Sequence, residues 1–304
     1  MWRKGWFELI IAIFPNMRPL YSFILLVLLV FLALFACKSL DKNLDDYSLM
    51  LDDDGIWVEQ FDSTNVDESR YNHNNSIFKE NISFVYSFKH LTKDNKRLSF
   101  KYVDSISDWK FEPYSSQKDG LFEKVNITVT KGLGQILRAI PDYNQTVLSY
   151  SYLTHNNFAP FGSTSGVIEN ERNVWMHPPR DKYFKILELN PFPYIKAPYK
   201  IGNHWDWKLT IGDPWSDPRW MSWNGLVENT YDYEIIDKSR IKTALGNLNC
   251  FMIQSKATSR LGKTGLISYF HKKYGFVRLD YLNIDGSKTV LELVDVINLD
   301  ADSK

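Results

Sequence analysis

Two short segments in the middle of the chain gather the residue types that recognise or transform ligands. The first is WMHPPR at residues 175–180, and the second is DPWSDPRWMSW at residues 213–223. Large aromatic side chains held among prolines are suited to line a pocket or to present a flat face to a sugar or a lipid. We therefore expect the two segments to form one site, and the alternative is that the tryptophans of the second segment only pack the loop. Its candidate ligand-binding residues are Trp175, His177, Arg180, Trp215, Arg219, Trp220 and Trp223.

Arg180 and Arg219 are the cations of this candidate site. A guanidinium group matches the geometry of a carboxylate or a phosphate, so either arginine could meet an anionic group at the rim of the site. The interpretation that we favour is a salt bridge within the protein. The nearby carboxylates are Glu169, Glu171, Asp213 and Asp217.

His177 precedes Pro178-Pro179, which restricts its backbone. An imidazole needs a well-placed partner before it can act as a catalytic base, and the chain contains no G-x-S-x-G elbow to supply one. The six histidines are scattered and show no H-E-x-x-H spacing. We predict no catalytic residue, no metal ligand and no cofactor, and we expect the protein not to be an enzyme.

Two carboxylates keep an enzymatic alternative open. Glu169 and Glu171 lie two positions apart in GVIENERN. On a strand they would share a face about 7 Å apart, which is a separation that glycoside hydrolysis allows. A glycan hydrolase is therefore the alternative function.

The first 36 residues have the pattern of an export signal. Residues 20–36 form an apolar run without a charged side chain, and this run is barely long enough to span a bilayer as a helix. Met17-Arg18 places a start-like methionine and a positive charge directly before the run. We predict a signal peptide over residues 1–36, with the true start at Met1 or Met17.

The apolar run ends in Leu34-Phe35-Ala36-Cys37. This sequence resembles the lipobox of Gram-negative bacterial lipoproteins, although Phe35 replaces the small residue that is usual there. The resemblance implies that the leader is cut before Cys37 and that Cys37 carries the lipid. Several acyl chains at ~0.8 kcal/mol per buried CH₂ would make the anchor practically permanent. The alternative is an uncleaved signal-anchor helix in which Cys37 is an ordinary apolar residue.

This resemblance implies a protein of the cell envelope, anchored to the outer membrane on its periplasmic or surface side. The residues that follow the cysteine are acidic and poor in apolar side chains. We therefore predict a flexible tether over residues 37–70, before a β-rich domain at residues 71–304.

Beyond about Asn74 the hydrophobic pattern alternates with a period of two. Such alternation is typical of strands with one buried face. The predicted strands include ISFVYSFK, RLSFKYV, VNITVT, TVLSYSYL, FKILEL, HWDWKLTI, TYDYEII, CFMIQS, GLISYF, GFVRLDYL and TVLELVDV. Asp285-Gly286 is a two-residue hairpin signal between the last two of these runs. We predict an all-β fold with a single antiparallel domain, built as a curved sheet, half-barrel or sandwich.

The segment 156–223 differs in composition, because it holds eight of the twelve prolines and six of the ten tryptophans. Proline removes a backbone donor and is confined to sheet edges and loops. We expect long ordered loops here rather than a second domain. Trp205 and Trp207 alternate with His204 and Asp206, so we expect these two tryptophans to point into the core.

The C-terminal part, roughly residues 226–297, contains LGNLNCFMIQ, GLISYFHKKYGFV and TVLELVDV. It resembles the closing hairpins of uncharacterised exported β-proteins with domains of unknown function. WMHPPR and LELNPFPYI resemble parts of the same group of lipoproteins. The resemblance implies a fold and a location, and it assigns no catalytic residue.

The charge balance excludes one class of partner. The chain has 36 basic and 36 acidic residues, so it lacks the positive excess with which proteins bind nucleic acid. We expect a non-catalytic, lipid-anchored envelope protein that binds a small hydrophobic molecule, a glycan or an envelope partner protein. A structural or assembly lipoprotein is a further alternative.

Overall fold

The computed structural model describes residues 48–59, 75–114, 120–132 and 143–300. All of these residues except Ser48 belong to the compact unit Leu49–Lys304. The strands are β1 (Leu49–Leu51), β2 (Trp57–Glu59), β3 (Ile82–Leu91), β4 (Arg97–Val103), β5 (Asp108–Pro113), β6 (Leu121–Val129), β7 (Thr146–Thr154), β8 (Gly162–Glu169), β9 (Asn173–Met176), β10 (Tyr194–Lys196), β11 (His204–Ile211), β12 (Val227–Thr243), β13 (Gly246–Ser259), β14 (Gly262–His271), β15 (Gly275–Leu282) and β16 (Lys288–Asn298). The 3₁₀ helices are η3 (Asp104–Ile106), η4 (Lys182–Leu189) and η5 (Asp213–Trp215).

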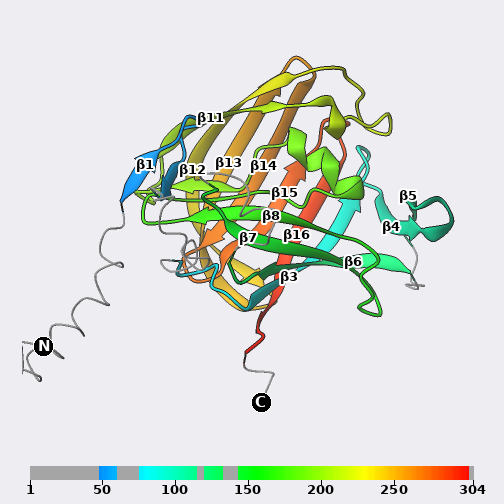
Figure 1. Ribbon diagram of the computed structural model, residues 1–304, viewed down its shortest axis with the longest axis horizontal. Helices are drawn as coiled ribbons and strands as arrows, with labels where there is room; N and C mark the ends of the chain where they lie inside the picture. Colours follow the sequence, from blue (N-terminus) through cyan, green and yellow to red (C-terminus); the bar gives the residue numbers. More distant parts are fainter. Residues whose placement is uncertain (1–47, 60–74, 115–119, 133–142, 301–304) are drawn as a thin grey trace, which may run out of the picture. The chain divides into compact units, whose positions relative to one another are not determined.

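One strongly curved antiparallel sheet makes up most of this unit (Figure 1). Its strands follow the order β10-β9-β8-β7-β6-β4-β3-β16-β15-β14-β13-β12-β11, and β5 pairs with β4 beside that path. Strands β1 and β2 form a separate two-stranded sheet. The predicted all-β class and the single curved antiparallel sheet are confirmed.

The alternating pattern explains why the sheet has one buried face. Along β12, Tyr231, Tyr233 and Ile235 are buried, whereas Asp232 and Glu234 between them are exposed. The predicted turn at Asp285-Gly286 joins β15 to β16, and Gly286 adopts a φ of 79° that a residue with a side chain rarely adopts. The buried face encloses a continuous apolar core, so we expect the unit to fold without the leader.

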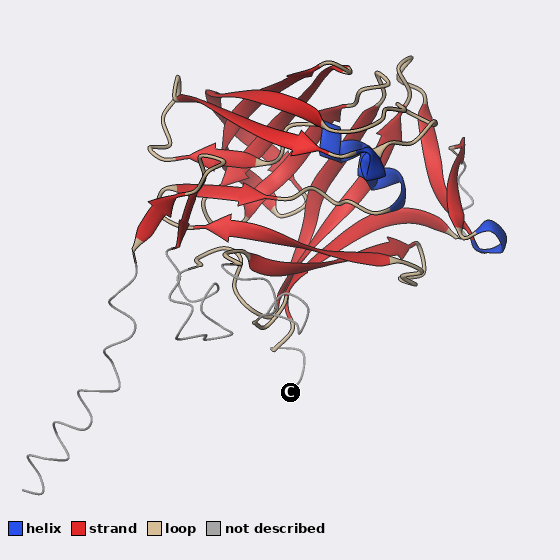
Figure 2. Cartoon of the chain, turned by 45° about the horizontal axis from the view of Figure 1, so that its top comes forward, coloured by secondary structure: helices blue, strands red, loops and turns tan. Residues whose placement is uncertain are grey.

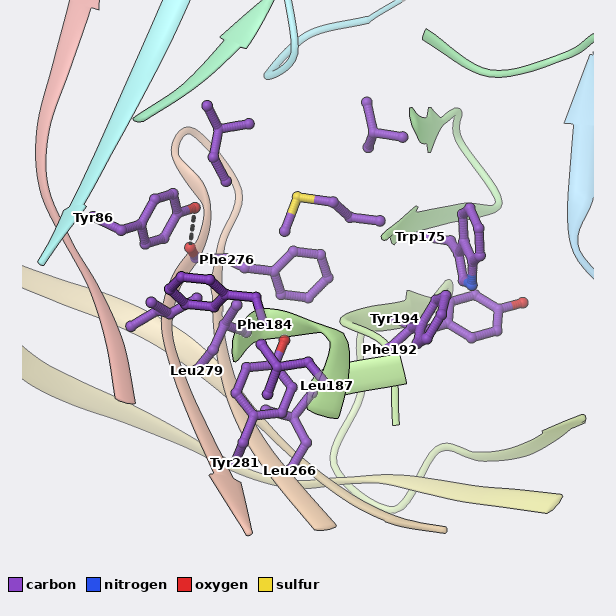
Figure 3. Packing of buried hydrophobic residues seen from close by; sticks show 14 of the residues in the cluster. Tyr86, Trp175, Phe184, Leu187, Phe192, Tyr194, Leu266, Phe276, Leu279 and Tyr281 are labelled. Carbon is purple, nitrogen blue, oxygen red and sulfur yellow. Dashed lines mark hydrogen bonds between the residues drawn. The ribbon is translucent and has the colours of Figure 1, made fainter. Parts of the chain in front are cut away.

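One predicted strand is wrong. FKILEL lies within η4, whose start is capped by Asp181 and whose residues are mostly buried. The hydroxyl group of Tyr183 lies 2.6 Å from Oγ1 of Thr289 and 2.8 Å from Nδ1 of His90, which fixes the helix to two strands of the sheet. Figure 2 shows η4 as the longest helix of the unit, and Figure 3 shows Phe184 and Leu187 packed near Leu279, Tyr281 and Leu266. Tertiary packing overrides the local pattern here.

The tether predicted over residues 37–70 is also wrong where the structure describes it. Ile56 and Val58 are only 3% and 2% exposed and belong to the hydrophobic core. The backbone N–H of Trp57 donates to Oδ1 of Asn173 at 2.9 Å, so β2 is bound to the sheet. The buried side chains of Ile56 and Val58 and the backbone hydrogen bonds of Trp57 dock this short hairpin despite the acidic residues around it.

The loop-rich segment predicted over residues 156–223 is more regular than expected. It contains β8, β9, β10 and β11 in addition to η4 and η5. Strands β10 and β11 are the two edges of the sheet, and Pro191, Pro193 and Pro198 flank β10. Edge strands tolerate neighbouring prolines because one side of each edge needs no ladder partner.

The predicted signal peptide, Cys37 and the remaining parts of the tether lie outside the described residues. Within the ranges that the structure does describe, no helix is long and apolar enough to cross a membrane.

Candidate functional site

Arg180 connects three segments of the chain. Its Nε lies 3.0 Å from Oε1 of Glu188 on η4, an ion pair whose alignment is too poor for a good hydrogen bond. The guanidinium carbon lies 4.6 Å from the ring centroid of Trp215, and the backbone N–H donates to the hydroxyl of Tyr152 at 3.2 Å. The structure therefore brings Arg180 and Trp215 together, as expected for one site. The carboxylate that Arg180 meets is Glu188, which the sequence analysis did not consider.

His177 lies beside Arg180 rather than beside a carboxylate. Nη1 of Arg180 is 3.3 Å from Nδ1 of His177, and the ring of Trp175 packs edge-on at 4.6 Å. A guanidinium can only donate, so Nδ1 must accept and the imidazole is neutral. Burial and the positive charge of Arg180 hold the pKa of His177 well below its ordinary value. A cation in this position makes the imidazole a weaker base, which is the opposite of the arrangement in a catalytic dyad.

Glu188 is the buried carboxyl group of this cluster. Burial raises its pKa to about 7, and the charge of Arg180 limits that rise. Its side chain is 3% exposed, compared with 23% for Arg180. Arg180, His177 and Glu188 pack tightly and support the segment before η4. Of the two partners in the ion pair, only Arg180 is partly exposed.

Arg219, the second predicted cation, lies in an ion-pair cluster separate from that of Arg180. Arg219 forms ion pairs with Asp217 at 2.6 Å and with Asp108 at 3.0 Å, in agreement with the salt-bridge interpretation. Its guanidinium carbon also lies 3.9 Å from the ring centroid of Trp109. These contacts use the donors of Arg219, so it is not available for a ligand in this conformation.

Trp220 and Trp223 are core residues and do not form the predicted pocket wall. They are 7% and 6% exposed, and Trp220 stacks on Trp109 with ring centroids 6.0 Å apart and an interplanar angle of 15°. Trp215 is half-buried and packs against the same core. Trp220 and Trp223 face inward, where burial of a large apolar surface stabilises the fold.

Trp175 lies in the core as well, at 4% exposure. Trp205 and Trp207 are buried, as the alternation along β11 predicted. Trp207 stacks on Tyr231 with ring centroids 4.9 Å apart. These aromatic residues fill the inside of the curved sheet.

Glu169 has a structural role that excludes it from the proposed glycosidic pair. Its Oε1 accepts hydrogen bonds from the backbone N–H and the hydroxyl of Ser76 at 2.8 and 2.7 Å and from the N–H of Ile77 at 2.9 Å. Its Oε2 accepts from the N–H of Phe78 at 2.9 Å. Glu171 is exposed, so the two carboxyl groups do not share one environment.

Two other polar groups that could carry chemistry are accounted for by their neighbours. Cys250 is buried, and burial raises the pKa of its thiol to about 11, which keeps it protonated. His204, Asp206 and Asp232 are exposed and close enough to share a cation, but Nε2 of His204 already forms an ion pair with Asp232 at 2.8 Å. We assign no function to either group.

A concave site occurs where the sheet branches. Strand β3 pairs with β6 from Ser83 to Ser87, and then pairs with β4 at His90 and Leu91. Strand β4 pairs with β6 at only two positions, Phe100 opposite Phe122 and Lys101 opposite Leu121. The three short ladders enclose a gap in the sheet, beside the hairpin β4–β5 at the right of Figure 1.

This gap, which we term the branch pocket, has a volume of about 330 Å³. Its lining residues are Ser87, Phe88, Lys89, Arg97, Leu98, Ser99, Phe100, Tyr114, Leu121, Phe122, Glu123, Lys124 and Val294. The volume lies at the lower end of the ~300–1,000 Å³ range of small-molecule sites. None of the seven residues predicted to bind a ligand lines it.

The branch pocket combines an apolar floor with a charged rim. Phe88, Phe100 and Phe122 lie beneath it and are nearly fully buried, with Phe100 and Phe122 at a centroid distance of 4.9 Å. The basic groups at the rim are Lys89, Arg97 and Lys124, and the acidic group is Glu123.

The branch pocket leaves little local signal in the sequence because it arises from the pairing of strands that are distant in the chain. The alternation in RLSFKYV and ISFVYSFK predicts the strands but not their register. One available signal was that Lys89 occupies an outward position of the predicted strand ISFVYSFK and that Lys124 directly precedes the predicted strand VNITVT.

No family model matches the chain, and no curated protein matches its sequence. Solved structures that resemble it include one described as an exported protein with a YmcC-like fold from Bacteroides fragilis, at 11% identity and a TM-score of 0.41, covering 73% of this chain and 97% of that chain. Another is described as a lipoprotein from Parabacteroides distasonis, at 11% identity and a TM-score of 0.39, with coverage of 73% and 97%. A third is the hypothetical lipoprotein YmcC from Escherichia coli, at 10% identity and a TM-score of 0.30, with coverage of 70% and 83%. We draw no assignment from similarity at this level.

Proposed function

We propose that the protein is a lipid-anchored, non-catalytic protein of the cell envelope that binds a small ligand with an apolar portion in the branch pocket. The observation that carries the binding role is the pocket itself, an opening in the sheet above three buried phenylalanine rings. Burial of an apolar group there contributes about 25 cal/mol for each Å² removed from water, against the entropic cost of association.

The anchor rests on the sequence of the leader. An apolar run directly followed by Leu34-Phe35-Ala36-Cys37 is the pattern at which lipoprotein leaders are cut and lipidated. The docked hairpin β1–β2 begins at Leu49, only twelve positions after Cys37.

Changing Cys37 to serine is expected to abolish lipid labelling, because serine lacks the thiol that receives the acyl group. The measurement is metabolic labelling with a fatty-acid analogue, followed by membrane fractionation. Cys250→Ser is the matched control, since Cys250 is buried in the sheet and should leave labelling unchanged. A Cys37→Ser protein that is still cut and still fractionates with membranes would contradict the anchor.

Filling the branch pocket is expected to abolish binding of a neutral apolar dye. Ser87 lines the pocket from an outward position of β3, so Ser87→Phe places a ring in the opening. Ser149→Phe is the matched control, because Ser149 occupies an outward position of β7 away from the pocket. The measurement is a fluorescence titration with Nile red on the soluble chain without residues 1–37.

We expect at least about a tenfold weaker affinity for Ser87→Phe, which corresponds to about 1.4 kcal/mol, and an unchanged affinity for the control. Circular dichroism and melting curves establish that both variants are folded. Equal binding by both variants, or no binding by the unmodified chain, would refute the proposed binding role.

A further inference from the structure

The basic rim of the branch pocket specifies the chemistry of the ligand. We propose that the pocket takes an amphiphile with a single acidic head group, a carboxylate or a phosphate, whose apolar chain enters the gap in the sheet. This inference rests on the proposed binding role of the same pocket and adds the class of ligand.

The register of the strands places two lysines side by side at the pocket. Lys124 of β6 lies directly opposite Ser87 of β3, and Lys89 follows Ser87 by two positions on the same outward face. The two lysines are therefore diagonal neighbours at the mouth of the pocket, and both line it. Like charges at such neighbouring positions of a sheet destabilise it unless a counter-charge lies between them.

The carboxylates of Glu123 and Glu292 lie near the two lysines, but each also has another basic neighbour. Oε2 of Glu123 lies 3.1 Å from Nδ1 of His155, on the side of β7. Glu292 of β16 lies opposite Ser87 in one ladder and opposite Arg278 of β15 in the next, and Nε of Arg278 forms an ion pair with Asp280 at 2.9 Å. The rim consequently has three basic groups and one acidic group among its lining residues.

Arg97 lies at the outer edge of the pocket. Its guanidinium carbon lies 3.9 Å from the ring centroid of Tyr114, which supports the side chain without using its hydrogen-bond donors on an acid. A guanidinium held in this way can bind two oxygens of a carboxylate or phosphate at once.

The apolar floor and the charged rim of the pocket are close enough together for a single ligand to contact both. Phe88 alternates with Lys89 along β3, so the floor and the rim belong to adjacent residues of the same strand. In the proposed complex the chain of the ligand enters between β3, β4 and β6, and its head group stays at the outer face, where water screens the charges only partly.

The test compares ligands that share a ten-carbon chain and differ in the head group. Decanoate, decyl phosphate and 1-decanol each displace Nile red from the soluble chain without residues 1–37, at 50 mM and at 500 mM salt. We expect the two anions to compete at about a tenfold lower concentration than decanol at low salt, and we expect this advantage to shrink at high salt. Inorganic phosphate alone should not displace the dye.

A double variant Lys89→Gln/Lys124→Gln should bind decanol as the unmodified chain does and should lose most of the preference for the anions, with Arg97 as the remaining cation of the rim. Lys256→Gln/Lys263→Gln is the control, because these residues lie on β13 and β14 and do not line the branch pocket. If decanol and decanoate displace Nile red at the same concentration, the acidic head group is refuted while the proposed binding role stays intact. Loss of all binding in the unmodified chain would refute both, and displacement by inorganic phosphate alone would replace the amphiphile with a simple anion.

Discussion

Replacing Glu169 by alanine is expected to lower the free energy of unfolding by about 3–5 kcal/mol, because buried donors left without an acceptor cost about 1–3 kcal/mol each. Glu169 is 7% exposed and accepts three backbone N–H bonds from residues 76–78. Ile77 and Phe78, which these bonds position, are 6% and 1% exposed in the core. Loss of the carboxylate therefore releases both the hydrogen bonds and the packing of this segment.

The measurement is urea denaturation of the soluble chain followed by tryptophan fluorescence. Glu171→Ala is the matched control, since Glu171 lies two residues further along the chain and is exposed. Its substitution should change stability by less than about 0.5 kcal/mol. A loss below about 1 kcal/mol for Glu169→Ala would show that the segment 76–78 is held mainly by other contacts.

Trp220→Ala should lower the free energy of unfolding by about 3–5 kcal/mol, as expected when a large buried aromatic side chain is truncated. Trp220 is 7% exposed and stacks on Trp109 of β5. Arg219 lies over the ring of Trp109 and is held there by Asp217 and Asp108, so the substitution also loosens that cluster.

Leu226→Ala is the control for this substitution, because Leu226 is a large apolar residue nearby in the chain that is 73% exposed. It should unfold at nearly the same urea concentration as the unmodified protein. If Trp220→Ala remains equally stable but no longer binds Nile red, the binding site lies at the tryptophan loops and not in the branch pocket.

The fold was predictable because strand formation leaves a local signal. In TYDYEII the alternation of apolar and polar residues directly gives the buried face of β12, and Asp285-Gly286 gives the turn into β16. FKILEL carries a similar alternation but forms η4, because the Tyr183 hydroxyl and the buried Leu187 fix it inside the sheet. Periodicity cannot distinguish a short strand from a short helix when distant contacts decide between them.

The candidate site was less predictable than the fold. Proline-rich loops with tryptophans indicate a rigid aromatic surface, but the sequence does not show whether that surface faces a ligand or the core. Trp220 and Trp223 face the core, whereas Arg180 and Trp215 do meet at the surface. The branch pocket depends on where β3 changes partners, and that property belongs to the sheet and not to any one segment.

The proposed function requires an apolar ligand to lie in the branch pocket. Photocrosslinking with a diazirine derivative of decanoate, followed by peptide mass spectrometry, locates the chain of the ligand. We expect crosslinks in residues 87–89, 97–100 and 121–124, which line the branch pocket, and we expect Ser87→Phe to remove them. Crosslinks confined to residues 175–180 and 213–223, unaffected by Ser87→Phe, would contradict the branch pocket as the binding site.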